Sequence, residues 1–338
     1  MTLKIAVDAQ GGDKAPAPNI EGAIAALQPG GLGTIARKQD IEIVLVGRKD
    51  MIKEELARRH VSTLPIEIEN ATEVVEMEDS PMDSTKNKPD SSIAVGIRLL
   101  KEKKADAFIT AGNSGAMMTS AVMNLGRLKG VKRPAIAAVF PTIDDPCVIV
   151  DVGANAECKP KHLYQFAVMG EAYVRDVFKK RIPRISLLSM GHEEGKGNTL
   201  TRTAYKFLME SDMNFIGNIE GGDIIKGAAD VVVCDGFTGN VVLKFGESAA
   251  QSLFEMLRNE IGKGFFRKLG AGMMKGALKE IKKQVLYEEV GGAPLLGING
   301  TCIICHGMSN ALAIRNAINA AAEAVEQDLN KHIEEKLG

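Results

Sequence analysis

Two stretches of the sequence, ADAFITAGNSG over Ala105–Gly115 and ADVVVCDGFTG over Ala229–Gly239, share the pattern A-D-x5-G-x-[ST]-G. In each, a short apolar run reaches a glycine, and Ser114 or Thr238 follows where a helix N-cap is expected. The shared pattern predicts two strand-to-helix turns of one design, the basic unit of an α/β fold.

Strand and helix patterns alternate along the whole chain. The apolar runs are continuous, which is typical of strands buried on both faces of a parallel sheet. We expect strands at Ile5–Val7, Ile41–Val46, Ala135–Phe140, Val148–Val150, Ile185–Leu188, Val231–Cys234 and Cys302–Cys305. Helical spacing predicts helices at Met51–His60, Ser91–Lys103, Lys161–Lys179, Leu200–Met209, Val241–Ile261 and Ser309–Leu337. The alternation predicts an α/β fold with a doubly wound, mostly parallel sheet, whose ligands bind at the carboxyl ends of strands.

Composition excludes several classes of protein. Hydrophobic residues make up 45% and charged residues 25% of the 338 residues, the balance of a globular and not a disordered chain. The net charge of −1, the absence of Trp and the 4% of aromatic residues argue against a nucleic-acid partner. The odd count of 5 cysteines and the lack of an apolar signal core near Met1 predict a reduced, cytoplasmic protein.

Glycine-rich turns follow five of the expected strands and are the first candidates for a binding site. They span residues 8–13, 111–115, 151–155, 195–198 and 235–240. Such turns expose backbone N–H groups, and the helix N-terminus that follows adds partial positive charge, so together they bind anions such as phosphate. We expect all five at one edge of the sheet. The alternative is that glycine only permits tight turns.

Two further side chains stand near expected strand ends. Lys196 lies between glycines in GKGN and can approach a phosphate or an oxyanion; the alternative is a solvated loop lysine. His306 ends CIICH, which formally matches a haem attachment motif, but the apolar run suits a buried strand and predicts that Cys302 and Cys305 are buried thiols. The sequence contains neither G-x-x-x-x-G-K-[ST] nor a G-x-G-x-x-G after a strand, so the common nucleotide motifs are missing.

A basic amphipathic segment occupies residues 261–285. It carries seven Lys or Arg residues against Glu280 alone, together with an apolar stripe. Such a segment suits an anionic membrane surface or an acidic protein partner; the alternative is a surface helix that buries its apolar face. The residues expected to contact membrane or partner are Lys263, Phe265, Phe266, Arg267, Leu269, Met273, Lys275, Lys279 and Lys282.

Together these motifs resemble the bacterial phosphate acyltransferase family PlsX, the acyl-acyl-carrier-protein:phosphate acyltransferases. The resemblance runs from Ile5 to Gly307, nearly the whole chain. The matching stretches are IAVDAQGGD, ITAGNSGA, RLKGVKRPA, DVGAN, GHEEGKGN, NFIGNIE, ADVVVCDGFTGNV, GGAPLLG and the late His-Gly pair. The chain departs from the family at Gln10, where Met is usual, and after Gly307, where Ser is frequent.

The resemblance implies transfer of a long-chain acyl group from acyl carrier protein to inorganic phosphate. The acyl phosphate product would then serve a membrane acyltransferase in phospholipid synthesis. The resemblance also implies a fold like isopropylmalate dehydrogenase and phosphotransacetylase, with two lobes, a central cleft and a homodimer. We expect one unit over residues 1–338, with lobes at 1–135 plus 290–338 and at 136–289. We also expect peripheral association with the cytoplasmic membrane, and neither a cofactor nor a metal.

The implied reaction needs positioning and oxyanion stabilisation more than a nucleophilic side chain, because phosphate is already charged and a thiolate is a tolerable leaving group. Lys196 is assigned to phosphate or the oxyanion, and Asn240 to orienting the thioester. Asp235 and His306 are candidates for proton transfer. The residues expected to bind substrate are Asp8, Gly11, Gly12, Asn113, Ser114, Gly115, Arg133, Asn155, Gly197, Asn198, Thr238 and Gly239. Arg133 has the alternative of a structural ion pair.

Two other functions stay open. A metal- and NAD-dependent 2-hydroxy-acid dehydrogenase on the same fold would require Asp8, Asp151 and Asp235 to converge on a metal. A non-catalytic membrane scaffold would use only the basic segment and would leave the glycine-rich strand ends unexplained.

Overall fold

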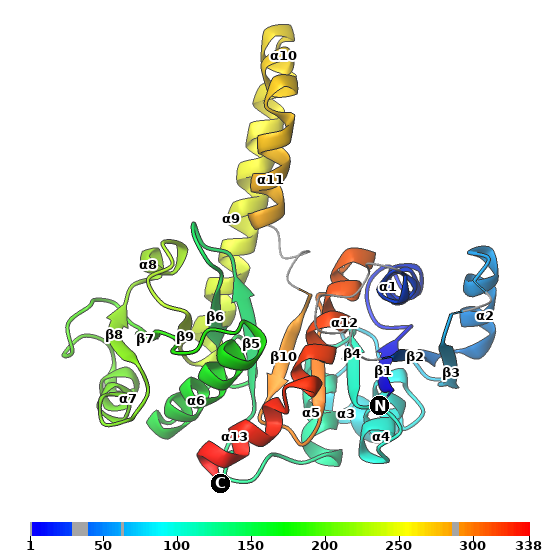
Figure 1. Ribbon diagram of the computed structural model, residues 1–338, viewed down its shortest axis with the longest axis horizontal. Coiled ribbons are helices and arrows are strands. Elements are labelled where there is room, and N and C mark those ends of the chain that lie inside the picture. Colours follow the sequence, from blue (N-terminus) through cyan, green and yellow to red (C-terminus); the bar gives the residue numbers. More distant parts are fainter. Residues whose placement is uncertain (1, 29–39, 62–63, 286–290) are drawn as a thin grey trace.

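One mixed sheet runs through the whole molecule (Figure 1). The computed structural model describes residues 2–28, 40–61, 64–285 and 291–338, with the backbone alone for 282–285. In this described chain the sheet has 11 strands. Their order is β3 (Ile66–Asn70), β2 (Ile41–Gly47), β1 (Leu3–Asp8), β4 (Ala107–Thr110), β11 (Thr301–Ile304), β10 (Ala293–Leu296), β5 (Ala135–Phe140), β6 (Cys147–Val150), β9 (Val231–Val233), β7 (Ile185–Leu188) and β8 (Phe215–Ile219).

The sheet contains two sets of parallel strands that run in opposite directions. The first set is β3, β2, β1, β4 and β11, and the second set is β6, β9, β7 and β8. Between them, β10 is antiparallel to β11 and β5, and β5 is antiparallel to β6. These three reversals put the carboxyl ends of the two sets at opposite edges of the sheet. The expectation that all five glycine-rich turns share one edge is therefore wrong.

The two edges are close together at the centre of the molecule because the central strands are short. β11, β10 and β6 have 4 residues each, β9 has 3, and β5, between β10 and β6, has 6. At about 3.3 Å per residue, a four-residue strand is about 13 Å long. A helix advances about 1.5 Å per residue, so two to three turns cover that height. A helix that crosses the centre of the sheet can thus contact turns on both edges.

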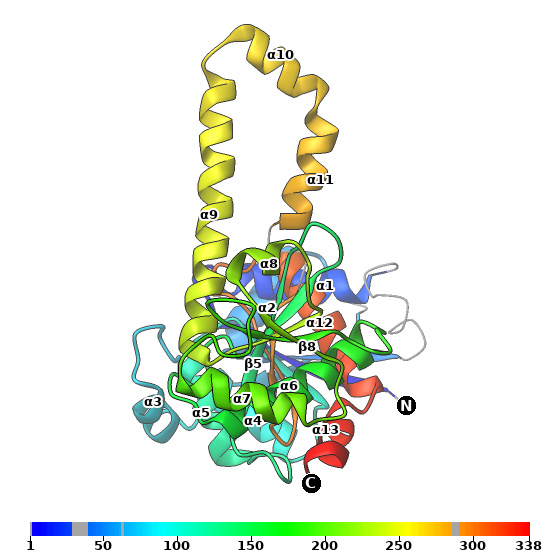
Figure 2. The same ribbon diagram turned by 90° about the vertical axis from the view of Figure 1, so that its left-hand side faces the viewer.

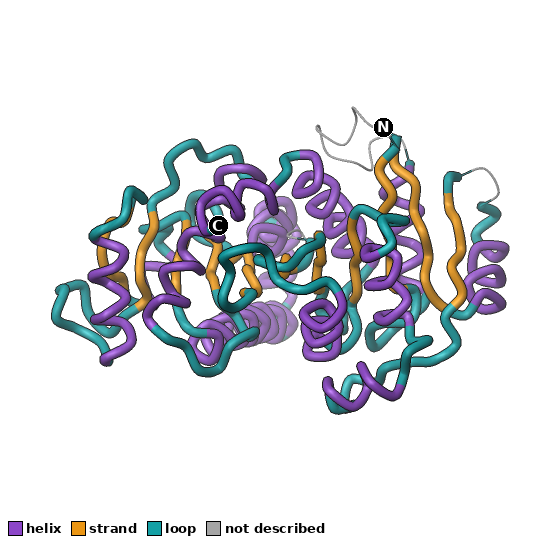
Figure 3. Tube along the Cα trace, turned by 90° about the horizontal axis from the view of Figure 1, so that it is seen from below, coloured by secondary structure: helices purple, strands orange, loops and turns teal. Residues whose placement is uncertain are grey.

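Helices cover both faces of the sheet, as the view in Figure 3 shows. One apolar cluster runs across both strand sets beneath α4 (Ser92–Lys101), α5 (Ser114–Asn124), α8 (Gly221–Ile225) and the first turns of α9 (Gly236–Gly262). On the other face, α1 (Ala17–Leu27), α2 (Lys49–Arg58) and α12 (Ala311–Glu326) pack on the first set. On this same face the second strand set is covered by α6 (Pro160–Val177), α7 (Thr199–Met209) and α13 (Leu329–Leu337). The division into lobes near residues 135 and 290 stays a prediction.

Most predicted elements are present, and the differences have local causes. The helix predicted over Ser309–Leu337 is broken into α12 and α13 at Asp328, whose φ of 51° lies in the left-handed region. Strand β3 was not predicted because its sequence, IEIEN, alternates and stays half exposed at the edge of the sheet. Strand β10 was missed because APLL contains Pro294, which is unusual inside a sheet.

The basic segment forms part of a helical hairpin that projects from the body (Figures 1 and 2). Helix α9 is 27 residues long and is followed by α10 (Phe265–Met273) and α11 (Lys275–Val285). α10 buries none of its side chains. The alternative of an ordinary surface helix that buries its apolar face is therefore wrong for α10 in the single chain. Lys263 and Arg267 both form salt bridges with Glu260, which neutralises part of the positive charge.

Candidate active site

Asp8, at the end of β1, organises the first glycine-rich turn. Its buried carboxylate accepts hydrogen bonds from the backbone N–H groups of Gln10 and Gly11, both at 2.9 Å, and from the Thr110 hydroxyl at 2.6 Å. Burial raises the pKa of Asp8. A Cβ on Gly11 would lie 2.7 Å from the backbone nitrogen of Gly112, so two glycine turns meet there. Asp8 thus lies behind the turn, where its carboxylate holds the backbone of the turn in place.

The His306–Gly307 pair lies against the same turn. Gly307 accepts a hydrogen bond from the backbone N–H of Asp13 at 2.8 Å. Gly12 has a φ of 107°, and a Cβ there would lie 3.0 Å from the Gly307 oxygen. The His306 Nδ1 accepts from the backbone N–H of Met308 at 3.1 Å, and the imidazole is exposed. The structure therefore brings His306 to the edge formed by the predicted residues Gly11 and Gly12.

Asp151 directly follows β6 and organises the glycine-rich turn of residues 151–155, just as Asp8 organises the turn after β1. Its buried carboxylate accepts from the backbone N–H groups of Ile136, Gly153, Ala154 and Asn155 at 2.8–3.2 Å. It also accepts from the Asn155 amide at 2.9 Å. Burial raises the pKa of this carboxyl group too. Asn155 is held in this way at the edge of the second strand set.

The N-terminus of α5 is covered by a segment that the side chain of Asn113 holds in place. Asn113 is the N-cap and accepts from the backbone N–H of Ala116 at 2.9 Å. Its amide nitrogen donates to three carbonyl oxygens within residues 76–79 at 3.1–3.2 Å. Gly115 faces the first residue of α3 (Pro81–Asn87), since a Cβ there would lie 2.6 Å from Pro81. Asn113 therefore positions the loop over the site.

The two turns of the repeated pattern differ in detail. Ser114 and Thr238 were expected as N-caps, but the caps are Asn113 for α5 and Asp235 for α9. Asp235 accepts from the backbone N–H and the hydroxyl of Thr238 at 2.9 and 2.8 Å. Helix α9 consequently begins at Gly236, five residues before the predicted start at Val241. Thr238 lies inside the first turn of α9.

The first turn of α9 packs directly on the Asp151 turn. A Cβ on Gly239 would lie 1.9 Å from the Asp151 carbonyl oxygen, and one on Gly236 would lie 2.8 Å from the backbone nitrogen of Asn155. Only glycine allows this approach. Asn240 lies beside Gly153, whose added Cβ would be 3.9 Å from the Asn240 Cβ. The structure thus brings the predicted residues Asn155, Gly239 and Asn240 together.

Helix α9 then reaches the opposite edge. Burial raises the pKa of Glu247, and the nearby charges of His306 and Lys244 oppose this shift in part. Asn240 and Glu247 are seven residues apart, about 10 Å along the helix. This face of α9 therefore connects Asn240 at one edge with His306 at the other. Glu247 is not among the site residues predicted from the sequence, although the spacing of Asn240, Lys244 and Glu247 places them on one helix face.

Lys196 lies further along the edge of the second strand set, in the loop between β7 and α7. Strand β7 adjoins β9, so this loop follows the Asp235 turn along the edge. Lys196 is exposed, and its backbone N–H donates to Glu193 at 3.0 Å. Asn198 caps α7 by accepting from Thr201 at 2.9 Å, and Gly197 has a φ of 96°. The side chain of Asn198 is thus used to begin a helix.

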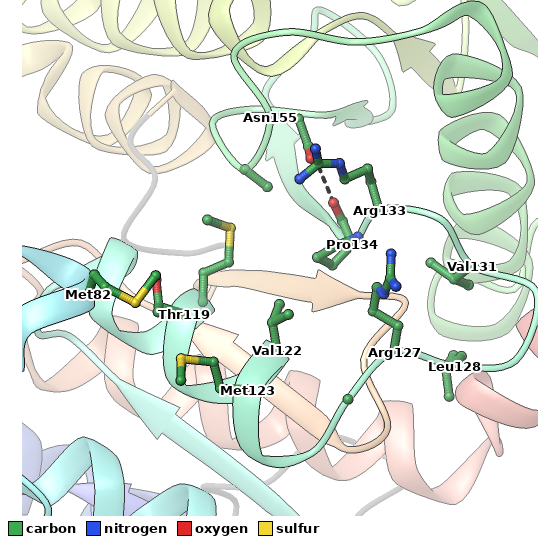
Figure 4. A pocket seen from close by; sticks show the side chains of 13 residues that line it. Met82, Thr119, Val122, Met123, Arg127, Leu128, Val131, Arg133, Pro134 and Asn155 are labelled. Atoms are coloured by element: carbon green, nitrogen blue, oxygen red, sulfur yellow. Dashed lines mark hydrogen bonds between the residues drawn. The ribbon is translucent and has the colours of Figure 1, made fainter. Parts of the chain in front are cut away.

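A cavity of about 560 Å³ lies between α5 and the Asp151 turn (Figure 4). Its walls are mostly apolar, with polar groups from Thr119, Arg127, Arg133 and Asn155. The full lining is Met82, Met118, Thr119, Val122, Met123, Gly126, Arg127, Leu128, Val131, Arg133, Pro134, Ala154 and Asn155. The cavity is therefore lined from α3, α5, the loop after α5 and the second strand set. Among the described residues, Arg133 forms no salt bridge, so the alternative of a structural ion pair is not what this structure contains.

The thiols and carboxylates do not form a metal cluster in the described part of the chain. Cys302 and Cys305 are buried, as predicted, and burial raises the pKa of each to about 12. Asp8 and Asp151 each bind the backbone of their own turn, and Asp235 caps α9. The three carboxylates therefore do not converge as a metal-dependent dehydrogenase would need. Within the described residues, no helix is long and apolar enough to cross a membrane.

Several known proteins are similar to this chain in sequence or in fold. Residues 3–332 match the model of the family described as "Fatty acid synthesis protein". A phosphate acyltransferase of Dictyoglomus turgidum is 46% identical over 337 residues, covering 99% of this chain and 98% of that protein. One of Geobacter sulfurreducens is 48% identical over 335 residues, covering 99% of this chain and 94% of that protein.

Among solved structures, a phosphotransacetylase from Streptococcus pyogenes has a TM-score of 0.63 at 17% identity, covering 96% of this chain and 94% of that one. A branched-chain phosphotransacylase from Enterococcus faecalis has a TM-score of 0.52 at 10% identity, covering 96% and 99%.

Proposed function

The chain belongs to the fatty acid synthesis protein family of phosphate acyltransferases, and on this premise we propose that it moves a long-chain acyl group from acyl carrier protein to inorganic phosphate. Membership of this family shows acyl transfer to phosphate. We propose in addition that acyl carrier protein is the donor, that the acyl group is long and that the product serves phospholipid synthesis. The observation that carries it is the full-length match, which includes the turns that meet at α9.

The chemistry requires little of the protein beyond binding and charge stabilisation. A phosphate oxygen attacks the thioester carbonyl carbon, the C–S bond breaks, and the carrier leaves as a thiolate that takes up a proton. Phosphate is already anionic at neutral pH, so no strong base has to create the nucleophile. Oriented N–H groups and cations stabilise the oxyanion that forms during attack.

The residues near the first turn of α9 are proposed to act on the thioester. The Asn240 amide and the backbone N–H groups near Thr238 and Gly239 orient the carbonyl group, and Lys196 binds phosphate or the oxyanion. His306, beside Glu247, is the better candidate for proton transfer to the thiolate, because Asp235 already holds the N-terminus of α9. Substrate contacts at Gly11, Gly12, Ser114, Gly115, Arg133, Asn155, Gly197 and Asn198 remain part of the proposal, with Asp8 and Asn113 as positioning residues.

A trapping experiment tests this function. The protein is incubated with acyl carrier protein thioester, with and without inorganic phosphate, and acyl phosphate is trapped with hydroxylamine. We expect hydroxamate and free carrier thiol in equal amounts, both dependent on phosphate. Thiol release that does not depend on phosphate would overturn the proposal. Hydride transfer to NAD with a 2-hydroxy acid, without trapped hydroxamate, would favour the dehydrogenase.

The projecting hairpin is proposed to hold the protein peripherally on the cytoplasmic membrane. Phe265, Phe266 and Met273 are 75%, 84% and 84% exposed at its tip, beside Leu269. The membrane cations proposed with them are Lys263, Arg267, Lys275, Lys279 and Lys282, the last with its side chain outside the described residues. Each cation near an anionic leaflet contributes about 1 kcal/mol. The acyl phosphate would thereby be released close to a membrane acyltransferase.

We expect the double substitution Phe265→Glu and Leu269→Glu to release the protein from anionic vesicles, because two charges replace side chains that enter the headgroup boundary. Transfer from soluble acyl carrier protein should be unchanged. Flotation with phosphatidylglycerol vesicles measures binding. Ile143→Glu with Ile182→Glu is the matched control, since both isoleucines are exposed on the body, at 73% and 72%. Wild-type flotation of the hairpin variant would place the anchor elsewhere, and flotation of a protein without transferase activity would favour the scaffold.

The hairpin also supports the proposed homodimer. Phe245 and Leu253 on α9 are 74% and 62% exposed, and Met256 is 59% exposed. Apolar side chains in this number on one projecting helix suit burial against the same helix of a second copy. Light scattering at micromolar concentration should give twice the chain mass of 36.2 kDa. A single-chain mass would contradict the dimer.

A further inference from the structure

Four exposed cations lie in or next to the segments that line one side of the cavity. They are Arg127, Lys132, Arg133 and Lys159, here called the cationic rim. Arg127 and Arg133 line the cavity, as Figure 4 shows. In the described chain, none of the four forms a salt bridge with a carboxylate. Arg127 donates a hydrogen bond to the Lys132 carbonyl oxygen, and among the described residues no carboxylate neutralises the four charges.

The carboxylates next to the rim are Glu157 and Glu334, and Asp83 is exposed beside the lining residue Met82 on the α3 side of the cavity. Glu157 is exposed two residues before Lys159. Glu334, on α13, accepts the backbone N–H of Lys129 at 2.9 Å, and Lys129 adds another exposed cation to this loop. The loop after α5 and the start of α6 thus carry an excess of positive charge, although the chain as a whole has a net charge of −1.

Buried polar side chains hold the rim in a fixed arrangement. Gln165, only 9% exposed on α6, donates to the Gly130 carbonyl at 2.9 Å and accepts from the backbone N–H of Lys132 at 2.8 Å. Asn155 donates to the Pro134 carbonyl at 2.7 Å. The loop is thereby fixed to α6 and to the Asp151 turn. The cations are presented without the ordering cost that a loose loop would carry on binding.

Two cations of the rim, Arg133 and Lys159, lie where positive charge is unfavourable. Lys159 is the N-cap of α6, whose first turn has no acidic residue, although a helix N-terminus favours negative charge. Burial, together with the charges of Arg133 and Lys159, lowers the pKa of His162 in the same turn. An anionic partner would relieve this unfavourable arrangement.

The cavity inside the rim suits an acyl chain. Its 560 Å³ lies within the roughly 300–1,000 Å³ of typical ligand sites. Met82, Met118 and Met123 supply flexible thioether side chains that adapt to an apolar ligand. The end of the cavity at Asn155 adjoins the first turn of α9, where the thioester is proposed to react.

We propose that the cationic rim is the docking surface for the acidic carrier protein, which inserts its acyl chain into the cavity between α5 and the Asp151 turn. This inference rests on the proposed function. The rim lies near the C-terminal helix, since a Cβ on Gly130 would be 1.9 Å from the Leu337 oxygen, and that end of the molecule is opposite the hairpin tip (Figures 1 and 2). A membrane bound at the tip leaves the rim facing a soluble donor.

The test compares two donors in the full-length protein. One is acyl carrier protein thioester, and the other is the same acyl group on N-acetylcysteamine, a small neutral thioester. For Lys132→Glu with Lys159→Glu we expect KM for the carrier donor to rise about tenfold with kcat unchanged, because rim charges act mainly on encounter. KM for the neutral donor should not change. The matched control, Lys53→Glu with Lys101→Glu, makes the same charge change at two exposed lysines on α2 and α4 and should leave both KM values at wild type.

Salt gives a second readout. Raising the salt concentration from about 0.05 M to 0.3 M should raise the wild-type KM for the carrier donor and affect the rim variant much less. An unchanged carrier KM in the rim variant overturns the docking surface, as does an equal rise for both donors. Loss of vesicle binding with an unchanged carrier KM would assign the rim to a membrane. Failure of the wild-type protein to transfer from either donor would instead overturn the proposed function.

Discussion

Replacing Gly239 by Ala is expected to lower acyl transfer at least about 100-fold and the free energy of unfolding by about 3 kcal/mol. A methyl group at this position would lie 1.9 Å from the Asp151 carbonyl oxygen and 2.9 Å from the Cys234 sulfur. The backbone oxygen cannot move without disturbing the buried Asp151 carboxylate and its hydrogen bonds. The first turn of α9 would therefore move away from the second edge of the sheet, and Asn240 would move with it.

Urea denaturation and the trapping assay measure the two effects, with circular dichroism to establish the folded fraction. Gly222→Ala in α8 is the matched control, because an added Cβ there meets no atom within 4 Å. That variant should keep wild-type activity and stability. If Gly239→Ala were as active and as stable as Gly222→Ala, the packing of α9 on the Asp151 turn would not support the site.

Replacing Lys196 by Ala is expected to lower kcat/KM for phosphate about 100-fold, as the loss of one oxyanion or phosphate donor does. The fold should be unaffected because Lys196 is exposed. The long side chain extends from the loop beside the Asp235 turn, and its charge is proposed to be recruited when substrate binds. If Lys196 binds phosphate in the ground state, the KM for phosphate rises; if it stabilises only the oxyanion, kcat falls.

Lys206→Ala, an exposed lysine on the following helix α7, is the control for a general loss of positive charge. It should retain wild-type kcat and KM. Lys196→Arg should recover part of the activity, since it restores the charge but not the geometry of the ammonium group. Near-normal turnover of a folded Lys196→Ala protein would remove this residue from the mechanism.

Much of the local structure follows from the sequence because it depends on neighbouring residues. The continuous apolar runs identified the buried central strands, and glycine after each run identified the turns. The half-exposed edge strand β3 was not predicted, because its sequence IEIEN has charged residues at alternate positions and no apolar run. The N-caps were misplaced because Asn113 and Asp235 compete with the hydroxyl residues that follow them, and only the hydrogen bonds distinguish them.

The amino-acid sequence was enough to predict an α/β protein with glycine-rich strand ends, and its motifs indicated a phosphate acyltransferase. Those features arise from short-range patterns of burial, turn geometry and side-chain chemistry. The folded chain was needed to show that β10 and β5 reverse the strand direction within the sheet. The turns therefore lie at two edges, and α9 connects them through Asn240 and Glu247. Strand direction depends on pairing between segments far apart in the chain, which no local pattern encodes. The same long-range packing placed Arg127, Arg133 and the three methionines around one cavity.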